Sequence, residues 1–177
     1  PLGQGRHSTR CSPVLEYIRK NRNDTAFSEI ILLAPLIRSK HWWVSRTLTW
    51  PADIFVDRIP RWHRPVTHDP AVTRFRKYGD PLKVDAVSLK WFKALCQWNA
   101  SVKIWEPLEV KALVLQGEQD GTVAWKHNLR KLRELLPRGE FVIVQRGRHQ
   151  LLNESPSIRK PVFRRIRQYL DANKPSH

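Results

Sequence analysis

The final third of the chain alternates between apolar strands and amphipathic helices, and this rhythm restricts the fold more than any other feature of the sequence. Residues 110–121 (VKALVLQGEQDG) form an apolar run that ends in a loop with two glycines. Residues 123–137 have leucines at helical spacing, 140–150 return to a strand pattern, and 155–172 have helical spacing again. Strand, helix, strand and helix in this order predict βα units and a parallel sheet.

Two segments near the amino terminus extend this pattern. Residues 12–20 (SPVLEYIRK) have helical spacing, with Ser12 as the expected cap and Pro13 at the first helical position. Residues 29–35 (EIILLAP) form a short apolar run closed by proline, which is typical of a fully buried parallel strand. We therefore expect an α/β fold with three parallel strands and flanking helices.

The middle of the chain, residues 38–104, has a different composition. It is rich in arginine, tryptophan and proline, and its periodicity is poor until residues 88–102 return to helical spacing. Proline cannot donate to a strand ladder, so we expect short helices and loops outside the main sheet.

Two residues with catalytic potential follow predicted strands of the second core piece. Asp120 lies beyond LVLQGEQ, and His149 lies beyond VIVQRGR. Ligands and catalytic groups gather at the carboxyl ends of parallel strands. Ser8, in the stretch GRHSTRC (5–11), lies just before the first predicted helix and completes the order serine, aspartate, histidine.

Each of these residues also has a plain structural interpretation. Asp120 precedes Gly121, and Asp-Gly is a common turn pair. His149 has the basic neighbours of an ordinary surface histidine, and Ser8 has the setting of a loop serine before a helix cap. The position of Asp120 and His149 at successive strand ends, in the right order, favours the catalytic interpretation.

Three segments resemble motifs of a known family. LVLQGEQDGTVAWKHN (113–128) and RGRHQLLNES (146–155) resemble the acid and histidine motifs of the lysophospholipase and monoacylglycerol lipase branch of the α/β-hydrolase superfamily. GRHSTRCSPVLEYI (5–18) is similar to the nucleophile elbow of that branch, usually G-H-S-x-G. The resemblance implies a partial α/β-hydrolase fold that corresponds to the second half of a complete hydrolase. It also implies three parts: a first piece of the core (1–37), an inserted, mainly helical cap (38–104) and a second piece of the core (105–177), which carries the acid and histidine loops.

The resemblance assigns roles to four residues. Ser8 would be the nucleophile, His149 the general base, and Asp120 the carboxylate that orients the imidazole. The backbone N–H of Thr9 would donate to the oxyanion. The implied function is hydrolysis of carboxylic esters of a lysophospholipid- or monoacylglycerol-like substrate through an acyl-enzyme, without a cofactor or metal.

Two departures from the family pattern lower the activity that we expect. Arg6 and Arg10 stand where the family has small residues that let the elbow turn sharply. The strands that precede the elbow in the family, including the one that would pair with residues 29–35, are not expected in this chain. We predict weak or no hydrolysis of activated esters, and a catalytically inactive hydrolase remnant is the alternative interpretation.

The charge of the chain suggests a further alternative. Lysine and arginine number 32 against 16 acidic residues, giving a net charge of +16, which favours contact with phosphates, anionic lipid or nucleic acid. A basic module that binds nucleic acid or an anionic membrane is therefore a second alternative. The usual nucleic-acid-binding motifs are missing from the sequence, which disfavours a nucleic-acid partner. For Trp42, Trp43 and Trp50 we prefer packing inside the cap to contact with a lipid surface.

The remaining sequence features restrict the setting. Cys11 and Cys96 form no CxxC pair, so we expect a reduced, cytoplasmic protein, with peripheral membrane contact as an option. No apolar run approaches the roughly 18 residues of a membrane span. His63, His68 and Asp69 lack further ligands at metal-binding spacing, so no metal is expected. The oligomeric state is left open.

Overall fold

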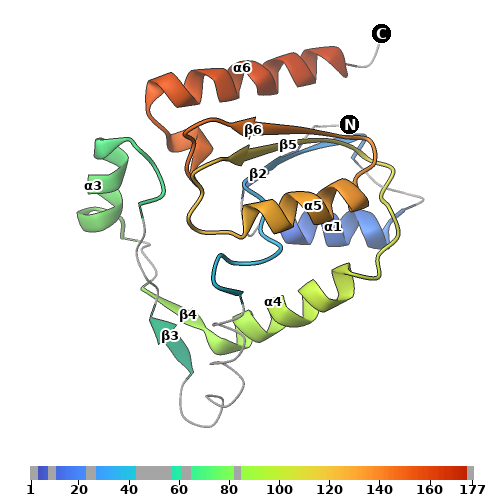
Figure 1. Cartoon of the computed structure of the whole chain (residues 1–177), viewed down its shortest axis with the longest axis horizontal. Helices are drawn as coiled ribbons and strands as arrows, with labels where there is room; N and C mark the ends of the chain where they lie inside the picture. The colour runs from blue at the N-terminus through green and yellow to red at the C-terminus, as the bar shows by residue number, and fades with distance from the viewer. Residues whose placement is uncertain are drawn as a thin grey trace.

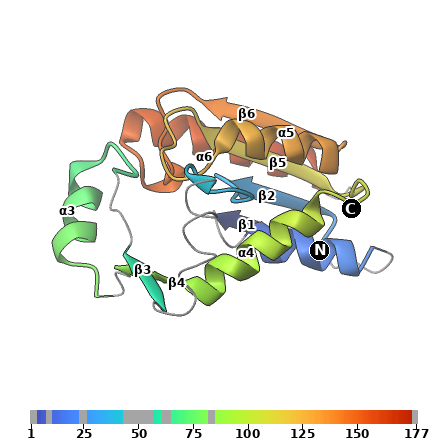
Figure 2. The same ribbon diagram turned by 60° about the horizontal axis from the view of Figure 1, so that its bottom comes forward.

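A computed structural model describes residues 4–7, 11–22, 27–42, 57–60, 65–81 and 85–174. Its main sheet has four parallel strands in the order β1-β2-β5-β6 (Figures 1 and 2). Their bounds are Gln4–His7 (β1), Glu29–Leu33 (β2), Lys111–Gly117 (β5) and Gly139–Val144 (β6). Because all four strands run in the same direction, their carboxyl ends share one edge of the sheet.

Helices cover both faces of the sheet. Figure 1 shows α1 (Cys11–Lys20) and α5 (Trp125–Leu135) on one face and α6 (Pro156–Ala172) on the other. Successive strand residues point to opposite faces, so β2 and β5 supply both cores. The core between the sheet and helices α1 and α5 includes Val14, Leu15, Ile18, Ile30, Leu32, Ala112, Val114, Leu129 and Leu132. The core between the sheet and α6 includes Ile31, Leu33, Leu113, Leu115, Val162 and Tyr169.

The amino-terminal end of the chain corrects two expectations. The three expected strands are present as β2, β5 and β6. The strand that was expected to be missing beside residues 29–35 is also present, because β1 pairs with β2 in parallel. Parallel pairing uses backbone groups, and four residues reading QGRH give no apolar pattern that would predict a strand. Ser12 lies inside α1 rather than before it, and its hydroxyl donates to the Leu36 carbonyl at 2.9 Å.

The described part of the middle segment adds no strand to the main sheet. Its helices are α3 (Pro70–Tyr78) and α4 (Leu89–Val102), and two short strands, β3 (Arg58–Pro60) and β4 (Ala86–Ser88), pair only with each other (Figure 2). This antiparallel ribbon was not predicted, because runs of three residues carry no periodic signal. The division of the chain at residues 37 and 104 stays a prediction.

Trp42 is an interior residue, as expected. Only 5% of its surface is exposed, and its ring centroid lies 5.7 Å from that of Phe92 on α4. Leu36, Leu95 and Val123 complete this cluster, which joins α4 to the segments that follow β2 and β5. Trp43 and Trp50 lie outside the described residues. Of the helices described here, none combines the length and apolar character needed to cross a bilayer.

Candidate active site

Asp120 and His149 meet at the carboxyl edge of the sheet. Asp120 follows β5, His149 follows β6, and these two strands are neighbours. The distance from His149 Nδ1 to Asp120 Oδ2 is 2.7 Å, and the two side chains are 8% and 0% exposed. This geometry confirms the prediction that the two side chains approach each other closely at adjacent strand ends.

Three further groups hold the Asp120 carboxylate. The backbone N–H groups of Thr122 and Val123 donate to Oδ1 at 2.7 and 3.2 Å, and the Gln116 amide donates to Oδ2 at 3.0 Å. Burial alone would raise the pKa of Asp120, but the hydrogen bonds from His149, Thr122 and Gln116 lower the pKa below its ordinary value. Asp120 is therefore ionised at neutral pH.

The ionised carboxylate determines the form of the imidazole. Asp120 Oδ2 can only accept, so His149 Nδ1 carries the hydrogen of their contact. In the neutral ring the basic lone pair is then on Nε2. An imidazole oriented in this way can take a proton at Nε2 and return it, while the carboxylate stabilises the positive charge formed in between.

Gly117 allows the two loops of this site to approach each other. A Cβ at position 117 would lie 2.3 Å from the Arg148 carbonyl oxygen and 2.5 Å from that of Gly147. Both contacts are shorter than the van der Waals distance. The contacting atoms belong to the backbone, so they cannot move aside as a flexible side chain could to make room for a larger residue. The close approach of β5 to the His149 loop therefore depends on glycine.

Glu154 ties the His149 loop to the middle segment. This residue is fully buried, and its carboxylate accepts from the backbone N–H groups of Arg148 at 2.8 Å and His68 at 2.7 Å. It also contacts the His68 Nδ1 at 3.2 Å and the Thr67 hydroxyl at 3.3 Å. Burial opposes ionisation, but the two backbone N–H groups and His68 lower the pKa of Glu154. The residues just before α3 are thereby fixed against the candidate base.

Sequence reasoning missed two buried polar residues of this site, Gln116 and Glu154. Each left a signal in the sequence. Gln116 is a polar residue that directly follows the apolar residues 112–115 near the end of the strand, and Glu154 comes five positions after the candidate histidine. Buried polar groups need hydrogen-bond partners, so polar residues at the end of a buried strand are candidates for a site.

The predicted nucleophile and oxyanion donor, Ser8 and Thr9, lie outside the described residues, as does Arg10. The structure describes what stands on both sides of them. β1 ends at His7, on the same edge of the sheet as the ends of β5 and β6, and α1 begins at Cys11. Three residues thus connect a strand to a helix, which is the local order that a nucleophile elbow requires.

Comparison with known proteins agrees with this architecture. The sequence matches the family described as serine aminopeptidase, S33, over residues 7–156, whereas the curated proteins contain no significant match. The structure is similar to that of a monoacylglycerol lipase of Paleococcus ferrophilus (TM-score 0.81, 17% identity). The similarity covers 97% of this chain and 68% of the lipase chain. It is also similar to a soluble variant of monoglyceride lipase from Saccharomyces cerevisiae, solved with a substrate analogue (TM-score 0.83, 20% identity, 99% and 63% covered).

A third similar structure is mouse alpha/beta hydrolase domain-containing protein 10 (TM-score 0.64, 14% identity, 98% and 63% covered). The chain thus spans about two thirds of the length of these proteins, and its fold is a partial one. The family match covers most of the sequence, and the parallel sheet with helices on both faces agrees with the fold of these similar structures. The chain therefore belongs to the serine aminopeptidase S33 family of α/β hydrolases.

Proposed function

We propose that this chain carries the catalytic groups of a serine ester hydrolase, with Ser8 as nucleophile, His149 as general base and Asp120 as the orienting carboxylate. The observation that carries the proposal is the buried 2.7 Å contact between His149 Nδ1 and Asp120 Oδ2 at neighbouring strand ends. This pair has the geometry of a base held in one tautomer. The pair lies at the edge of the sheet where β1 ends, and Ser8, the candidate nucleophile, is the first residue after β1.

The proposed reaction proceeds in two halves. In the first, Ser8 Oγ attacks the ester carbonyl carbon while His149 Nε2 takes the hydroxyl proton, and the Thr9 N–H stabilises the oxyanion. The alcohol leaves with the proton returned by His149, and an acyl-serine ester remains. In the second half, water gives a proton to His149 and attacks the acyl carbon, and the free acid leaves as Ser8 recovers its proton.

The proposed substrate is a small ester with a lipid-like acyl chain, such as a monoacylglycerol or a lysophospholipid. Two of the similar structures are lipases of monoacylglycerols by name, and one was solved with a substrate analogue. The excess of positive charge would favour binding of the chain to an anionic membrane surface, where it would hydrolyse its substrate.

Covalent labelling tests the proposal even where turnover is slow. A fluorophosphonate reacts with activated serines, so we expect one adduct on Ser8 by mass spectrometry. Labelling should be lost in Ser8→Ala, fall strongly in His149→Ala, and persist in Ser157→Ala, a serine exposed on α6. Hydrolysis of p-nitrophenyl butyrate is measured in parallel and should be weak. An adduct that survives Ser8→Ala, or no adduct at all, would contradict the proposal.

A further inference from the structure

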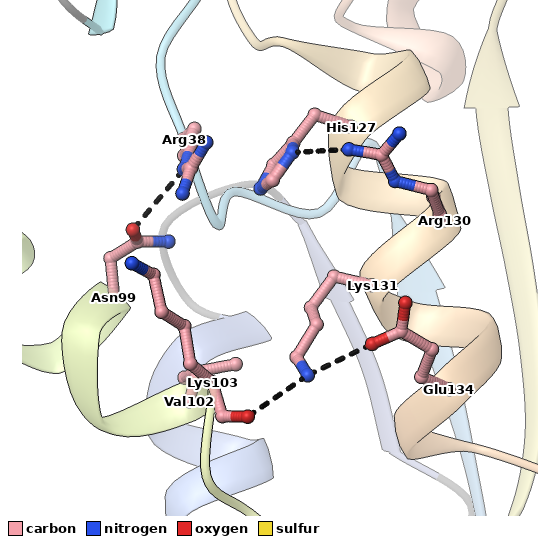
Figure 3. A pocket seen from close by; sticks show the side chains of 8 residues that line it. All are labelled: Arg38, Asn99, Val102, Lys103, His127, Arg130, Lys131 and Glu134. Atoms are coloured by element: carbon pink, nitrogen blue, oxygen red, sulfur yellow. Dashed lines mark hydrogen bonds and ion pairs between the residues drawn. The ribbon is translucent and has the colours of Figure 1, made fainter.

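One hollow of the molecule has no lining residue in common with the Asp120–His149 pair. It has a volume of about 220 Å³ and opens between α4, α5 and the segment that follows β2 (Figure 3). A water molecule occupies about 30 Å³ of liquid, so the hollow has room for a group of several heavy atoms. Its charged and titratable lining residues are Arg38, Lys103, His127, Arg130, Lys131 and Glu134. We call this hollow the basic pocket.

Helical spacing gathers these side chains. His127, Arg130, Lys131 and Glu134 follow one another at intervals of three, one and three positions, so they share a face of α5. The leucines at 129, 132 and 135 point to the core, which leaves this polar face of α5 turned toward α4. Figure 3 shows the side chains of α5 and Lys103 from the end of α4 on opposite walls of the basic pocket.

Arg38 is held in place by two buried asparagines. Its backbone N–H donates to the Asn128 side-chain oxygen at 3.0 Å, and the Asn128 amide donates back to the Arg38 carbonyl at 3.1 Å. The Arg38 Nε donates to the Asn99 side-chain oxygen at 3.2 Å. Asn99 is 5% exposed and Asn128 is fully buried. The guanidinium is therefore positioned by the interior of the protein, and it loses little freedom when a ligand binds.

The charges around the basic pocket do not balance. Four cationic side chains face one carboxylate, and that carboxylate, on Glu134, pairs with Lys131 at 2.9 Å. His127 responds to this surplus: burial, followed by the positive charges of Arg38 and Arg130, lowers the pKa of the imidazole. Neutral His127 accepts at Nδ1 from the Arg130 guanidinium at 3.3 Å. The local potential is therefore positive and favours an anion.

We propose that the basic pocket binds a phosphate monoester group. Its cationic side chains approach from three directions, namely the segment after β2, the end of α4 and the face of α5. A tetrahedral dianion with three terminal oxygens can satisfy donors from several directions at once, whereas a carboxylate offers two oxygens in one plane. The polar lining is unsuited to an acyl chain. This site is separate from the candidate active site and does not depend on ester hydrolysis.

The group could be presented by a small phosphorylated molecule or by a lipid headgroup, and the experiment distinguishes the two. Binding of inorganic phosphate and of glycerol 3-phosphate is followed by NMR at constant ionic strength, with chloride as the competing anion. Co-sedimentation with phosphatidylcholine vesicles, with and without phosphatidic acid, tests the lipid source. We expect saturable shifts at the amides of Lys103, Arg130 and Lys131, and a rise in the pKa of His127 when the dianion is bound.

Variants locate the binding. Lys103→Gln/Arg130→Gln removes two exposed cations of the basic pocket and should weaken the affinity for glycerol 3-phosphate by at least about tenfold. Arg164→Gln/Arg167→Gln removes the same charge from exposed positions of α6, on the opposite face of the sheet, and should leave the affinity within about twofold. Binding of the small phosphates indicates a soluble ligand, and binding only to phosphatidic acid vesicles indicates a headgroup. Equal losses in both variants, or shifts that never saturate, would overturn the proposal.

Discussion

At the scale of single residues, the candidate site depends on a carboxylate that cannot be exchanged for its amide. Asp120 accepts four hydrogen bonds, from His149, Gln116, Thr122 and Val123. An asparagine offers one oxygen in place of two, and its NH₂ group would face N–H donors that have lost their acceptor. The unsatisfied donors are buried, so water cannot replace the lost bonds.

Asp120→Asn should therefore damage both stability and chemistry. We expect the free energy of unfolding to fall by about 2–3 kcal/mol, measured by urea denaturation at pH 7. Fluorophosphonate labelling of Ser8 should slow by at least about 100-fold, because His149 loses the partner that fixes its tautomer. Asp171→Asn is the matched control, since Asp171 is exposed on α6 and pairs only with Lys174 among the contacts described. Equal effects of the two changes would refute the role given to Asp120.

At the scale of elements, the loop after β6 and the segment before α3 form one unit through Glu154. Residues 65–69 contact the loop through the Gln150 N–H, which donates to the Val66 carbonyl at 2.9 Å, and through the Thr67 hydroxyl, which donates to the Asn153 carbonyl at 2.6 Å. The buried carboxylate of Glu154 lies at the centre of these contacts. The position of His149 is therefore coupled to the middle segment and not to the sheet alone.

Glu154→Gln should loosen this junction. We expect a loss of about 2–3 kcal/mol in the free energy of unfolding and faster hydrogen exchange at the amides of His68 and Arg148, which donate to the carboxylate. Glu118→Gln makes the same chemical change in the neighbouring loop, where the exposed carboxylate accepts from the Arg146 N–H at 3.1 Å. That control should cost less than about 0.5 kcal/mol. Unchanged exchange at His68 in Glu154→Gln would show that the junction does not depend on the carboxylate.

At the scale of the whole molecule, two buried carboxylates with lowered pKa values make the fold sensitive to acid. The hydrogen bonds to these carboxylates hold the pKa of Asp120 below the ordinary 3.8 and the pKa of Glu154 below the ordinary 4.5. A lowered pKa stabilises the folded state at pH values above the ordinary pKa, and this contribution is lost as the pH falls through the folded-state pKa. Protonation of other carboxylates also increases the net charge above +16, which adds repulsion.

Stability should thus be constant above about pH 5 and fall steeply below about pH 4. Urea denaturation across this range measures it, and Asp120→Asn/Glu154→Gln should lose much less stability between pH 5 and pH 3 than the parent chain. Experiments at two salt concentrations separate the buried pair from general repulsion, because salt screens charges on the surface far more than buried ones. A double variant with the same pH dependence as the parent would assign the acid sensitivity to other groups.

The sequence predicted those parts of the molecule that repeat at short range. β5 is a continuous apolar run, α5 and α6 have apolar residues at helical spacing, and β6 has a strand pattern. The ends of the two strands directed attention to Asp120 and His149. The strands β1 and β3 are too short to have a period, and their pairing depends on backbone groups. The basic pocket brings together Arg38, Lys103 and Arg130, which are far apart along the chain. No local pattern in the sequence predicts that these side chains meet. Glu154 meets His68 in the same way, from 86 positions away along the chain.

The strand order has a consequence for how the chain folds. β5 and β6 are neighbours both in space and along the chain, with only α5 between them, whereas β2 joins β5 across the entire segment from residue 34 to residue 110. Closing a long loop costs more conformational entropy than closing a short one, and contacts at long range slow folding. We therefore expect the unit from β5 to α6 to form early and to receive β2 and β1 afterwards. The acid and the base would then be in place before the strand that leads to Ser8 arrives, so the last step of folding would also be the step that completes the catalytic groups.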